Sequence, residues 1–321
     1  MHAIGFGSLN LDEFWEVPQG FLHAHGLRLG EEYVRDIDWF RRIYPILSYQ
    51  GSLKAADPGG SAANMIAAML KMGFKTGFYG ATGREDAQLL RLNELGNSQN
   101  LMILQTHLPS GRCLALIDKD DPGKDRALVI LPNANDLAGS QGLDLKYFEA
   151  SGWVHMTSFV SDDPLQMQIE LAHKLAVGTR LSFDPGPIYC ERGLDVLKPL
   201  LLRTQILFIT EQELERLTGD AITETAVASL LSLGIDTVVV KLGVRGAHAF
   251  TGSKAIHRPA FEPSRILDRT GAGDVLAAGF LAGTIKCLGT EASLELAVRA
   301  AAKSIEGYGR KEYPDTTLLE G

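Results

Sequence analysis

Cysteine is scarce in this chain of 321 residues, and its three copies stand apart. Cys113, Cys190 and Cys287 form no Cys-x-x-Cys pair. Closely spaced cysteines are what a disulfide framework or a structural zinc site requires. Neither is indicated, and the pattern instead favours reduced thiols, as in a cytoplasmic protein.

An excess of positive charge is also missing, because 31 Lys and Arg face 39 Asp and Glu, for a net charge of −8. Nucleic-acid binding needs clustered cations that displace counterions from phosphates. We therefore expect a small-molecule partner and no nucleic acid. A site for an anionic nucleotide must then come from backbone N–H groups, helix N-termini, a few cations or a bound metal.

Long apolar runs are absent, since no stretch approaches the roughly 18 residues of a membrane span. Residues 1–7 lack a basic region followed by an apolar stretch, so no secretion signal is indicated. With 45% hydrophobic and 22% charged residues, the composition is typical of a folded domain. We expect a cytoplasmic protein with no membrane contact.

Two common nucleotide-binding strings are missing as well. The chain has no Gly-x4-Gly-Lys-Ser/Thr loop. Gly5 and Gly7 begin a Gly-x-Gly-x-x-Gly pattern, but Asn10 takes the third glycine position and Pro18 prevents the helix that should follow. A nicotinamide dehydrogenase is therefore disfavoured.

What the sequence does contain is an alternation of short apolar runs with longer helical patterns. The predicted strands are 3–7, 76–80, 153–156, 181–184, 206–209 and 237–241. The predicted helices are 61–72, 164–176, 193–202, 211–217 and 223–233. This rhythm predicts an α/β fold with a mainly parallel sheet.

Two segments, 10–50 and 101–131, break this rhythm, because the second holds strand-like runs with no helix between them. We expect both to form a small β-rich lid inserted in one domain that spans residues 1–321. The charged segment 118–126 is predicted to be a hairpin tip within this lid.

The strongest local motif is Asp268-Arg-Thr-Gly-Ala-Gly-Asp274, which runs directly into the apolar segment 275–283. A glycine-rich turn that opens a buried helix presents free N–H groups and the positive end of the helix dipole. Gly271 and Gly273 allow a close backbone approach. The motif therefore predicts an anion site.

Asp274 has two interpretations. A carboxylate beside a phosphate site is unfavourable unless it has a task, and accepting the proton of an attacking hydroxyl is such a task. Aspartate is also a common helix cap. The motif alone leaves both roles open.

Two further motifs are weaker. Asp57-Pro-Gly-Gly-Ser-Ala-Ala-Asn64 is a second glycine turn at a helix start, which is also consistent with a simple cap. Asn10 and Asp12 alternate just after the first strand, where polar groups suit the hydroxyls of a sugar, although polar strand ends are common.

Three more strings follow at suitable separations: Gly80-Ala-Thr-Gly83 with Asp86, Asn133-Ala-Asn135, and Lys241-Leu-Gly-Val-Arg-Gly246. In this order the motifs resemble those of the PfkB, or ribokinase-like, family of carbohydrate and nucleoside kinases. The resemblance covers essentially the whole chain. It implies a three-layer α/β/α, Rossmann-like fold with a lid, and a kinase that uses ATP and Mg²⁺.

The resemblance also implies roles for individual residues. For catalysis it implies Asp274 as base and the N–H groups of Gly271, Ala272 and Gly273 as anion hole. For the acceptor it implies Asn10, Asp12, Gly59, Gly60 and Asn64. For the nucleotide it implies Thr210, Lys241, Gly243, Gly246 and Thr270. For metals it implies Glu213, through water to Mg²⁺, and Asp268, beside a monovalent cation such as K⁺.

The chain departs from the family at three places, one of which is the turn after Asp86, where the usual glycine is missing. The family's Asn-x-x-Glu motif reads Thr210-Glu-Gln-Glu213 here, which affects the expected nucleotide or metal contacts. Asp184-Pro-Gly186 replaces the Asp-Pro-Asn of many sugar kinases. This change and the one after Asp86 disfavour the sugar-acid and fructose branches. Residues 59–64, preceded by the insertion at 20–56, are similar to the adenosine-kinase-like branch, and residues 7–12 are similar to the ribokinase branch. Both resemblances imply a ribose-type acceptor, free or carrying a base.

Two questions remain open at this point. A binding protein that retains the fold without the chemistry is the non-enzymatic alternative, because fold alone does not give function. An exposed lid edge can pair with a second copy, so a homodimer through the lid is a further expectation.

Overall fold

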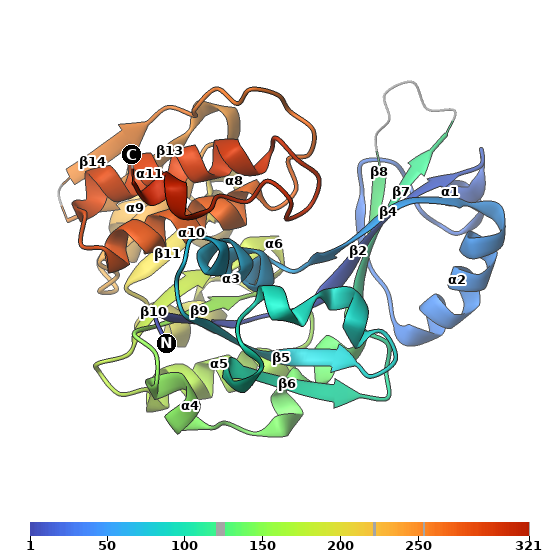
Figure 1. The fold of residues 1–321 in the computed structure, drawn as a ribbon, viewed down its shortest axis with the longest axis horizontal. Coiled ribbons are helices and arrows are strands. Elements are labelled where there is room, and N and C mark those ends of the chain that lie inside the picture. The colour runs from blue at the N-terminus through green and yellow to red at the C-terminus, as the bar shows by residue number, and fades with distance from the viewer. Residues whose placement is uncertain (120–125, 221–222, 253, 321) are drawn as a thin grey trace.

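The computed structural model describes residues 1–119, 126–220, 223–252 and 254–320 (Figure 1). Its strands are β1 (Ala3–Phe6), β2 (Asn10–Val17), β3 (Glu32–Val34), β4 (Ser52–Gly59), β5 (Thr76–Gly83), β6 (Leu101–Thr106), β7 (Gly111–Asp118), β8 (Arg126–Leu131), β9 (Trp153–Thr157), β10 (Arg180–Asp184), β11 (Ile206–Thr210), β12 (Thr237–Lys241), β13 (Ala247–Thr251) and β14 (Lys254–Arg258). Its α-helices are α1 (Phe21–Ala24), α2 (Ile37–Gln50), α3 (Ser61–Lys71), α4 (Leu145–Glu149), α5 (Asp162–Lys174), α6 (Gly186–Cys190), α7 (Leu194–Leu201), α8 (Glu211–Thr218), α9 (Thr223–Leu231), α10 (Ala272–Ile285) and α11 (Gly289–Ser304).

The large sheet has, within these residues, nine strands in the order β14-β13-β12-β11-β10-β9-β1-β5-β6. The strands from β12 to β6 pair in parallel, and β13 and β14 are antiparallel. Strand order reverses between β1 and β9. Every strand predicted from the sequence lies in this sheet, so the predicted mainly parallel α/β fold is confirmed.

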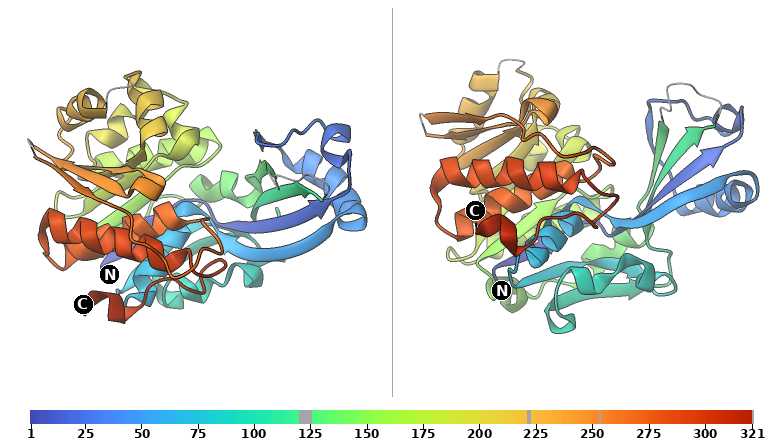
Figure 2. Two further views of the ribbon diagram at one scale, coloured as in Figure 1. Left: turned by 90° about the horizontal axis from the view of Figure 1, so that it is seen from above. Right: turned by 45° about the horizontal axis from the view of Figure 1, so that its top comes forward.

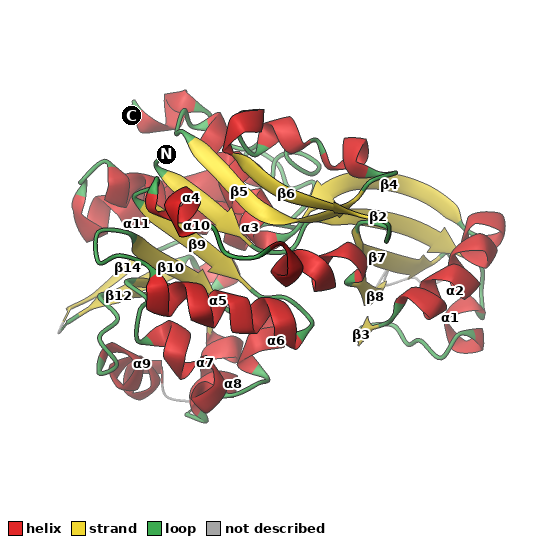
Figure 3. Ribbon diagram, turned by 90° about the horizontal axis from the view of Figure 1, so that it is seen from below, coloured by secondary structure: helices red, strands yellow, loops and turns green. Residues whose placement is uncertain are grey.

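Helices cover both faces of the large sheet (Figures 1 and 3). One apolar cluster joins α3, α10 and α11 to one face, and a second joins α5, α7, α8 and α9 to the other. Side chains alternate between the faces along each strand, so Val239 belongs to the first cluster and Val238 and Val240 to the second. Continuous apolar runs such as this one are typical of parallel strands covered on both sides.

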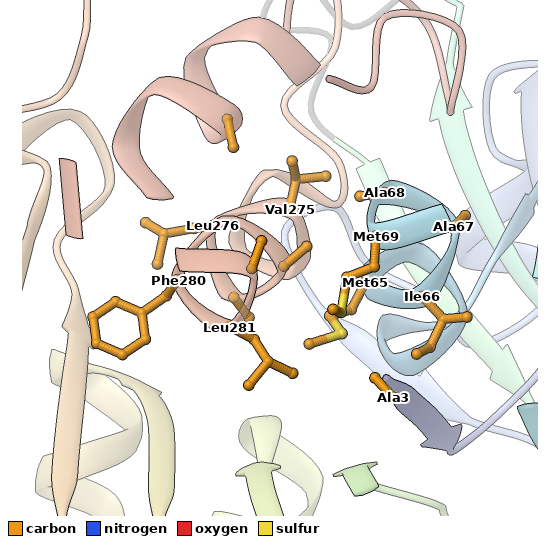
Figure 4. Packing of buried hydrophobic residues seen from close by; sticks show 14 of the residues in the cluster. Ala3, Met65, Ile66, Ala67, Ala68, Met69, Val275, Leu276, Phe280 and Leu281 are labelled. Carbon is orange, nitrogen blue, oxygen red and sulfur yellow. The ribbon is translucent and has the colours of Figure 1, made fainter. Parts of the chain in front are cut away.

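Helix α10 packs between α3 and α11, and Figure 4 shows its apolar side chains against those of α3. A Cβ added at Gly279 would lie 2.8 Å from Ala297 Cα, and one at Gly283 would lie 2.7 Å from Ser293 Cα. Glycine at both positions therefore allows α11 to approach closely. This packing fixes the position of the α10 N-terminus.

A second sheet projects from the body (Figure 2), in the order β3-β8-β7-β2-β4. On one of its faces, apolar residues of β2, β7 and β8 form a core with α1 and α2. The alternate residues of the same strands, among them Asp12, Cys113 and Ile130, line a cavity on the opposite face. The insertion after β2 thus gives the small sheet a core of its own.

The strands of this small sheet differ from the predicted lid segments at two places. The sequence analysis assigns Leu101–Thr106 to the lid, but β6 pairs with β5 in the large sheet. Short 3₁₀ turns at 87–100 connect these strands, so the helical signal of a crossover is missing. Conversely, β4 lies outside 10–50 but forms an edge of the small sheet; its mostly exposed residues carry little apolar pattern.

The charged segment 118–126, predicted as a hairpin tip, falls mostly on 120–125, which lie outside the described residues. Among the helices that the structure describes, none has the length and apolar character needed to cross a membrane.

Candidate active site

A cavity of about 340 Å³ lies at the carboxyl ends of the parallel strands, between the large and the small sheet. Ser8 and Asn10, which follow β1, line it together with Ser158, which follows β9. The strand order reverses between β1 and β9, and open α/β sheets bind ligands at such a switch point. The strand topology and the cavity therefore indicate the same ligand-binding position, next to the ends of β1 and β9.

The cavity collects much of the predicted site. The predicted residues that line it are Asn10, Asp12, Gly60, Asn64, Thr270, Gly271, Gly273 and Asp274. The predicted residues outside its lining are Gly59, Ala272, Thr210, Glu213, Lys241, Gly243, Gly246 and Asp268. Most residues predicted for the acceptor and the anion hole thus line one cavity, and those predicted for the nucleotide lie mostly outside its lining.

The N-terminus of α10 faces this cavity. Gly271 is the N-cap, with a φ of 76° that favours glycine. The N–H of Ala272 already donates to the carbonyl oxygen of Arg269, at 3.3 Å. Within the described part of the chain, the N–H groups of Gly271 and Gly273 have no such backbone acceptor. These two groups and the helix dipole make the helix start attractive to an anion.

Asp274 lies within the first turn of α10, so it is not the N-cap. Its Oδ2 accepts a hydrogen bond from Asn64 Nδ2 at 2.9 Å. Burial raises the pKa of Asp274 to about 7; the Asn64 bond and Lys241 oppose this rise, and the charge of Asp184 adds to it. A carboxyl group with a pKa near neutrality is suited to exchange a proton.

Asn10 is held in place by Asn135. The Nδ2 of Asn135 donates to Asn10 Oδ1 at 2.9 Å, and its Oδ1 accepts from the N–H of Leu9, also at 2.9 Å. The bond engages the oxygen of the Asn10 amide and leaves its NH₂ group available to a ligand. Asn135 itself belongs to the Asn-Ala-Asn string noted in the sequence.

Asp12 faces the same cavity from β2. Gly59 and Gly60 leave the space that its carboxylate and the neighbouring backbone occupy. A Cβ at Gly59 would overlap the Asp12 carboxylate, and one at Gly60 would overlap the carbonyl oxygen of Ser8. Gly60 also has a φ of 97°. Burial raises the pKa of Asp12 to about 7, against the opposing charge of Arg310.

Lys241 supplies a cation next to the anion site. It ends β12 and forms an ion pair with Asp184 at the end of β10, with 2.6 Å between Nζ and Oδ2. Burial alone would lower the pKa of Lys241, but Asp184 and Glu213 raise it to about 12. A Cβ at Gly273 would lie 3.8 Å from its Nζ. A permanent positive charge therefore lies beside the start of α10.

The other nucleotide-side residues are placed by local structure. Thr210 Oγ1 accepts from the N–H of Glu213 at 3.2 Å, and Glu213 Oε2 accepts from the N–H of Thr210 at 2.8 Å. This capping box gives the departure at Thr210 a structural role at the start of α8. Gly243 and Gly246, with φ of 60° and 91°, shape the turn between β12 and β13.

Asp268 joins the loop before α10 to the C-terminal segment. Its carboxylate accepts from the N–H of Thr270 at 2.9 Å and from that of Gly309 at 3.4 Å. These bonds are consistent with a structural role, and the cation contact implied for Asp268 stays a prediction.

Arg310 and Tyr313, in the C-terminal segment, are site residues that were not predicted from the sequence. Arg310 is only 6% exposed, and its Nε donates to Asn64 Oδ1 at 3.2 Å. Tyr313 Oη would lie 2.9 Å from a Cβ at Gly271. Both residues follow α11, and no short spacing links them to the motifs. Only the glycines at 307 and 309 indicate a turn there.

Comparison with known proteins shows which family the chain belongs to. The profile of the pfkB family of carbohydrate kinases matches residues 38–316. An uncharacterized sugar kinase of Archaeoglobus fulgidus is 30% identical over 246 residues, which are 75% of this chain and 96% of that protein.

Two solved structures share the fold. Arabidopsis thaliana ribokinase, complexed with ribose and ATP, has a TM-score of 0.79 at 23% identity, over 99% of this chain and 97% of that one. Sinorhizobium meliloti adenosine kinase has a TM-score of 0.82 at 21% identity, with the same coverage.

The fold and the family match define a kinase, a phosphotransferase that acts on a hydroxyl group of a sugar or nucleoside. The chain belongs to the pfkB family of carbohydrate kinases.

Proposed function

We propose that this kinase transfers the γ-phosphoryl group of ATP to a hydroxyl of a sugar or ribose-containing molecule, with Asp274 as base. The observation that carries the proposal is that Asp274, the start of α10 and the polar groups of Asn10 and Asp12 border one cavity. A base, an anion site and hydroxyl-binding groups are what such a transfer requires.

In the proposed reaction, Asn10, Asp12 and Asn64 orient the acceptor hydroxyl towards Asp274. The γ-phosphate lies at the start of α10, where N–H groups stabilise the charge of the transferring phosphoryl group. The acceptor oxygen bonds to phosphorus as the bond to the β-phosphate oxygen breaks. Asp274 takes the hydroxyl proton, and ADP leaves with the bonding electron pair.

Magnesium fits this proposal through the nucleotide. Across the described residues, no three His, Cys, Asp or Glu side chains converge on a metal position. Mg²⁺ commonly binds substrate phosphates with one or two carboxylates and water. We propose Glu213 as the carboxylate that contacts this water, and Asp268 as a neighbour of a K⁺ ion. The metal would neutralise phosphate charge.

The small sheet is proposed to act as a lid that excludes water, because water in an open site would compete as acceptor. A homodimer through this lid would use its edge strands β3 and β4, since α1 and α2 cover one face. All three cysteines are free thiols, which supports the proposed cytoplasmic setting.

A nucleoside acceptor is favoured by the apolar part of the cavity lining. Ile130, Val160 and Ile188 contribute apolar side chains, and Glu32 contributes a carboxylate to the same lining. A free pentose offers hydroxyls on every side, whereas a nucleoside adds a flat base with amino groups. The lining therefore suits a ribose that carries a base with a hydrogen-bond donor.

The test is ADP release from MgATP over a panel of pentoses, hexoses and nucleosides, with and without K⁺. We expect at least one ribose-containing compound to stimulate release, with nucleosides ahead of free ribose. A lack of stimulation by every compound would favour the alternative of a binding protein that retains the fold.

A further inference from the structure

Arg310 is a buried cation in the wall of the active site. It follows α11 and returns towards the cavity, where only 6% of its surface stays exposed. Its Nε donates to Asn64 Oδ1 at 3.2 Å, and its guanidinium lies 3.4 Å from Glu94. Buried arginines need partners of this kind, and here one partner is a residue that contacts Asp274.

The contact with Arg310 decides which way the Asn64 amide points. A guanidinium only donates, so the Asn64 atom that faces it must be the oxygen. The NH₂ group is then directed at Asp274 Oδ2, at 2.9 Å. In the reversed orientation, two oxygens would face each other, and the ionised carboxylate would lose its donor. Arg310 therefore selects the orientation that stabilises the ionised form of Asp274.

Other charged, polar or titratable groups also face Asp274. Asp184 on β10 and Lys241 on β12 act on it with opposite signs, and Ser61 on α3 adds a hydrogen bond. Tyr313, after α11, also faces it, and the Asp274 charge adds to the effect of burial in raising the pKa of this tyrosine. These groups neither contact Asn64 nor constrain its amide among the recorded bonds of the described residues. The charge of Arg310 also acts on Asp12, where it opposes the effect of burial.

We propose that Arg310 is a positioning residue for phosphoryl transfer, which acts through Asn64 to keep Asp274 ionised. The link from Arg310 to Asp274 stands on geometry alone. Its consequence for turnover rests on the proposed role of Asp274 as base.

The test replaces Arg310 by Met, which keeps an unbranched side chain and removes the charge and the donors. Arg91→Met is the matched control, because Arg91 forms ion pairs with Asp57 and Glu94 but has no bond to Asn64. Arg310→Lys is included in case the Met variant does not fold, since it keeps a charge but loses the planar fork.

The first measurement is carbon NMR titration of aspartate carboxyl groups in the ligand-free protein, with the Asp274 signal assigned by its loss in Asp274→Asn. We expect the Asp274 titration midpoint to rise by about one pH unit, a tenfold change, in Arg310→Met. A smaller rise is expected in Arg310→Lys, and none in Arg91→Met. A purely structural role would lower the melting temperature of these variants and leave the midpoint in place.

The second measurement is the pH dependence of kcat/KM for the acceptor, whose acidic limb should move upward with the NMR midpoint. An Asp274 midpoint that stays at its wild-type value in both Arg310 variants overturns the proposal, whatever the activity. If the midpoint moves but no compound is phosphorylated, the positioning role stands and the proposed function fails. The two failures are thus distinguishable.

Discussion

Two groups of residues are held in place in different ways: those proposed to bind the acceptor, here called the acceptor side or half, and those proposed to bind the nucleotide, here called the nucleotide side or half. On the acceptor side, hydrogen bonds join parts of the chain that are far apart: Asn64 and Asp274 are separated by 210 residues, and Asn64 and Arg310 by 246. On the nucleotide side, Thr210 and Glu213 bond to each other within one helical turn. The ion pair of Lys241 with Asp184 is a long-range contact in that half.

This difference indicates that the two sides contribute to different steps, the acceptor side to phosphoryl transfer and the nucleotide side mainly to ATP binding. Long-range bonds hold the acceptor groups in one geometry before substrate arrives, which is what stabilisation of a transition state requires. Local caps and turns mainly shape loops that a nucleotide can order when it binds. Changes on the acceptor side should therefore affect turnover and acceptor use, whereas those on the nucleotide side, apart from Lys241, should affect ATP affinity or stability.

Apart from changes at Asp274 itself, Lys241→Met should have the largest effect, because it breaks the long-range ion pair among the proposed nucleotide residues. It removes a charge beside the α10 start and leaves the Asp184 carboxylate buried without its cation. We expect kcat to fall by roughly 10²–10³, as when one anion-hole donor is lost. Steady-state kinetics with saturating ATP checks this, and Lys241→Arg is the control that keeps the charge. A change in KM for ATP alone would place Lys241 outside the chemical step.

Asp12→Asn should impair use of the acceptor without affecting ATP. A hydrogen bond from a hydroxyl to a charged group contributes about 1.5–3 kcal/mol, so kcat/KM for the acceptor should fall by roughly 10–10². KM for ATP should stay unchanged, because Asp12 lies on the small sheet. Initial rates with each substrate varied in turn measure both constants. Equal losses for both substrates would contradict the division into halves.

The pH dependence of kcat/KM for the acceptor should follow the protonation of Asp274 and Asp12. The pKa values of Asp274 and Asp12 are both raised to about 7, so both groups become protonated as the pH falls below that value. We expect kcat/KM for the acceptor to fall by about tenfold per pH unit or more below pH 7. The profile of Asp12→Asn should fall less steeply. A value of kcat/KM that stays constant down to pH 5 would contradict a base with a pKa of about 7.

Thr210→Ala should have the smallest effect. Loss of the N-cap oxygen costs about 1 kcal/mol of stability, which lowers the melting temperature of a chain of this size by about 1–2 °C. Thr210→Asn is the control, since asparagine also caps helices and restores the residue usual in the family. Thermal unfolding separates the two variants. An equal drop in both would mean that the capping box of α8 contributes no measurable stability.

Site residues that belong to local motifs could be predicted from the sequence, whereas those brought together by long-range contacts could not. The glycine turns at 59–60 and 271–273 carry their chemistry in neighbouring residues, so local patterns located them. Arg310 and Tyr313 reach the site only because α11 returns the chain to it, and no spacing encodes that return. The pairing of Lys241 with Asp184 likewise depends on strand order, which the sequence does not state.

Fold prediction shows the same limit. Apolar runs identified the central strands because both faces of each strand are buried. Strand β4 was not predicted, because its exposed residues lack that signal. The run at β6 was predicted as a strand but assigned to the wrong sheet, because no helix precedes it. The sequence therefore predicts the body of the fold well and the boundary of the lid poorly.

The most direct test of the central role of Asp274 is single-turnover transfer by Asp274→Asn, with bound ATP and the best acceptor from the panel. Asparagine preserves the shape and cannot take the hydroxyl proton. We predict that both substrates bind with wild-type affinity while the transfer rate falls by roughly 10²–10⁴ and loses its dependence on the neutral pKa. Transfer at a rate close to that of the wild type would contradict the assignment of Asp274 as base.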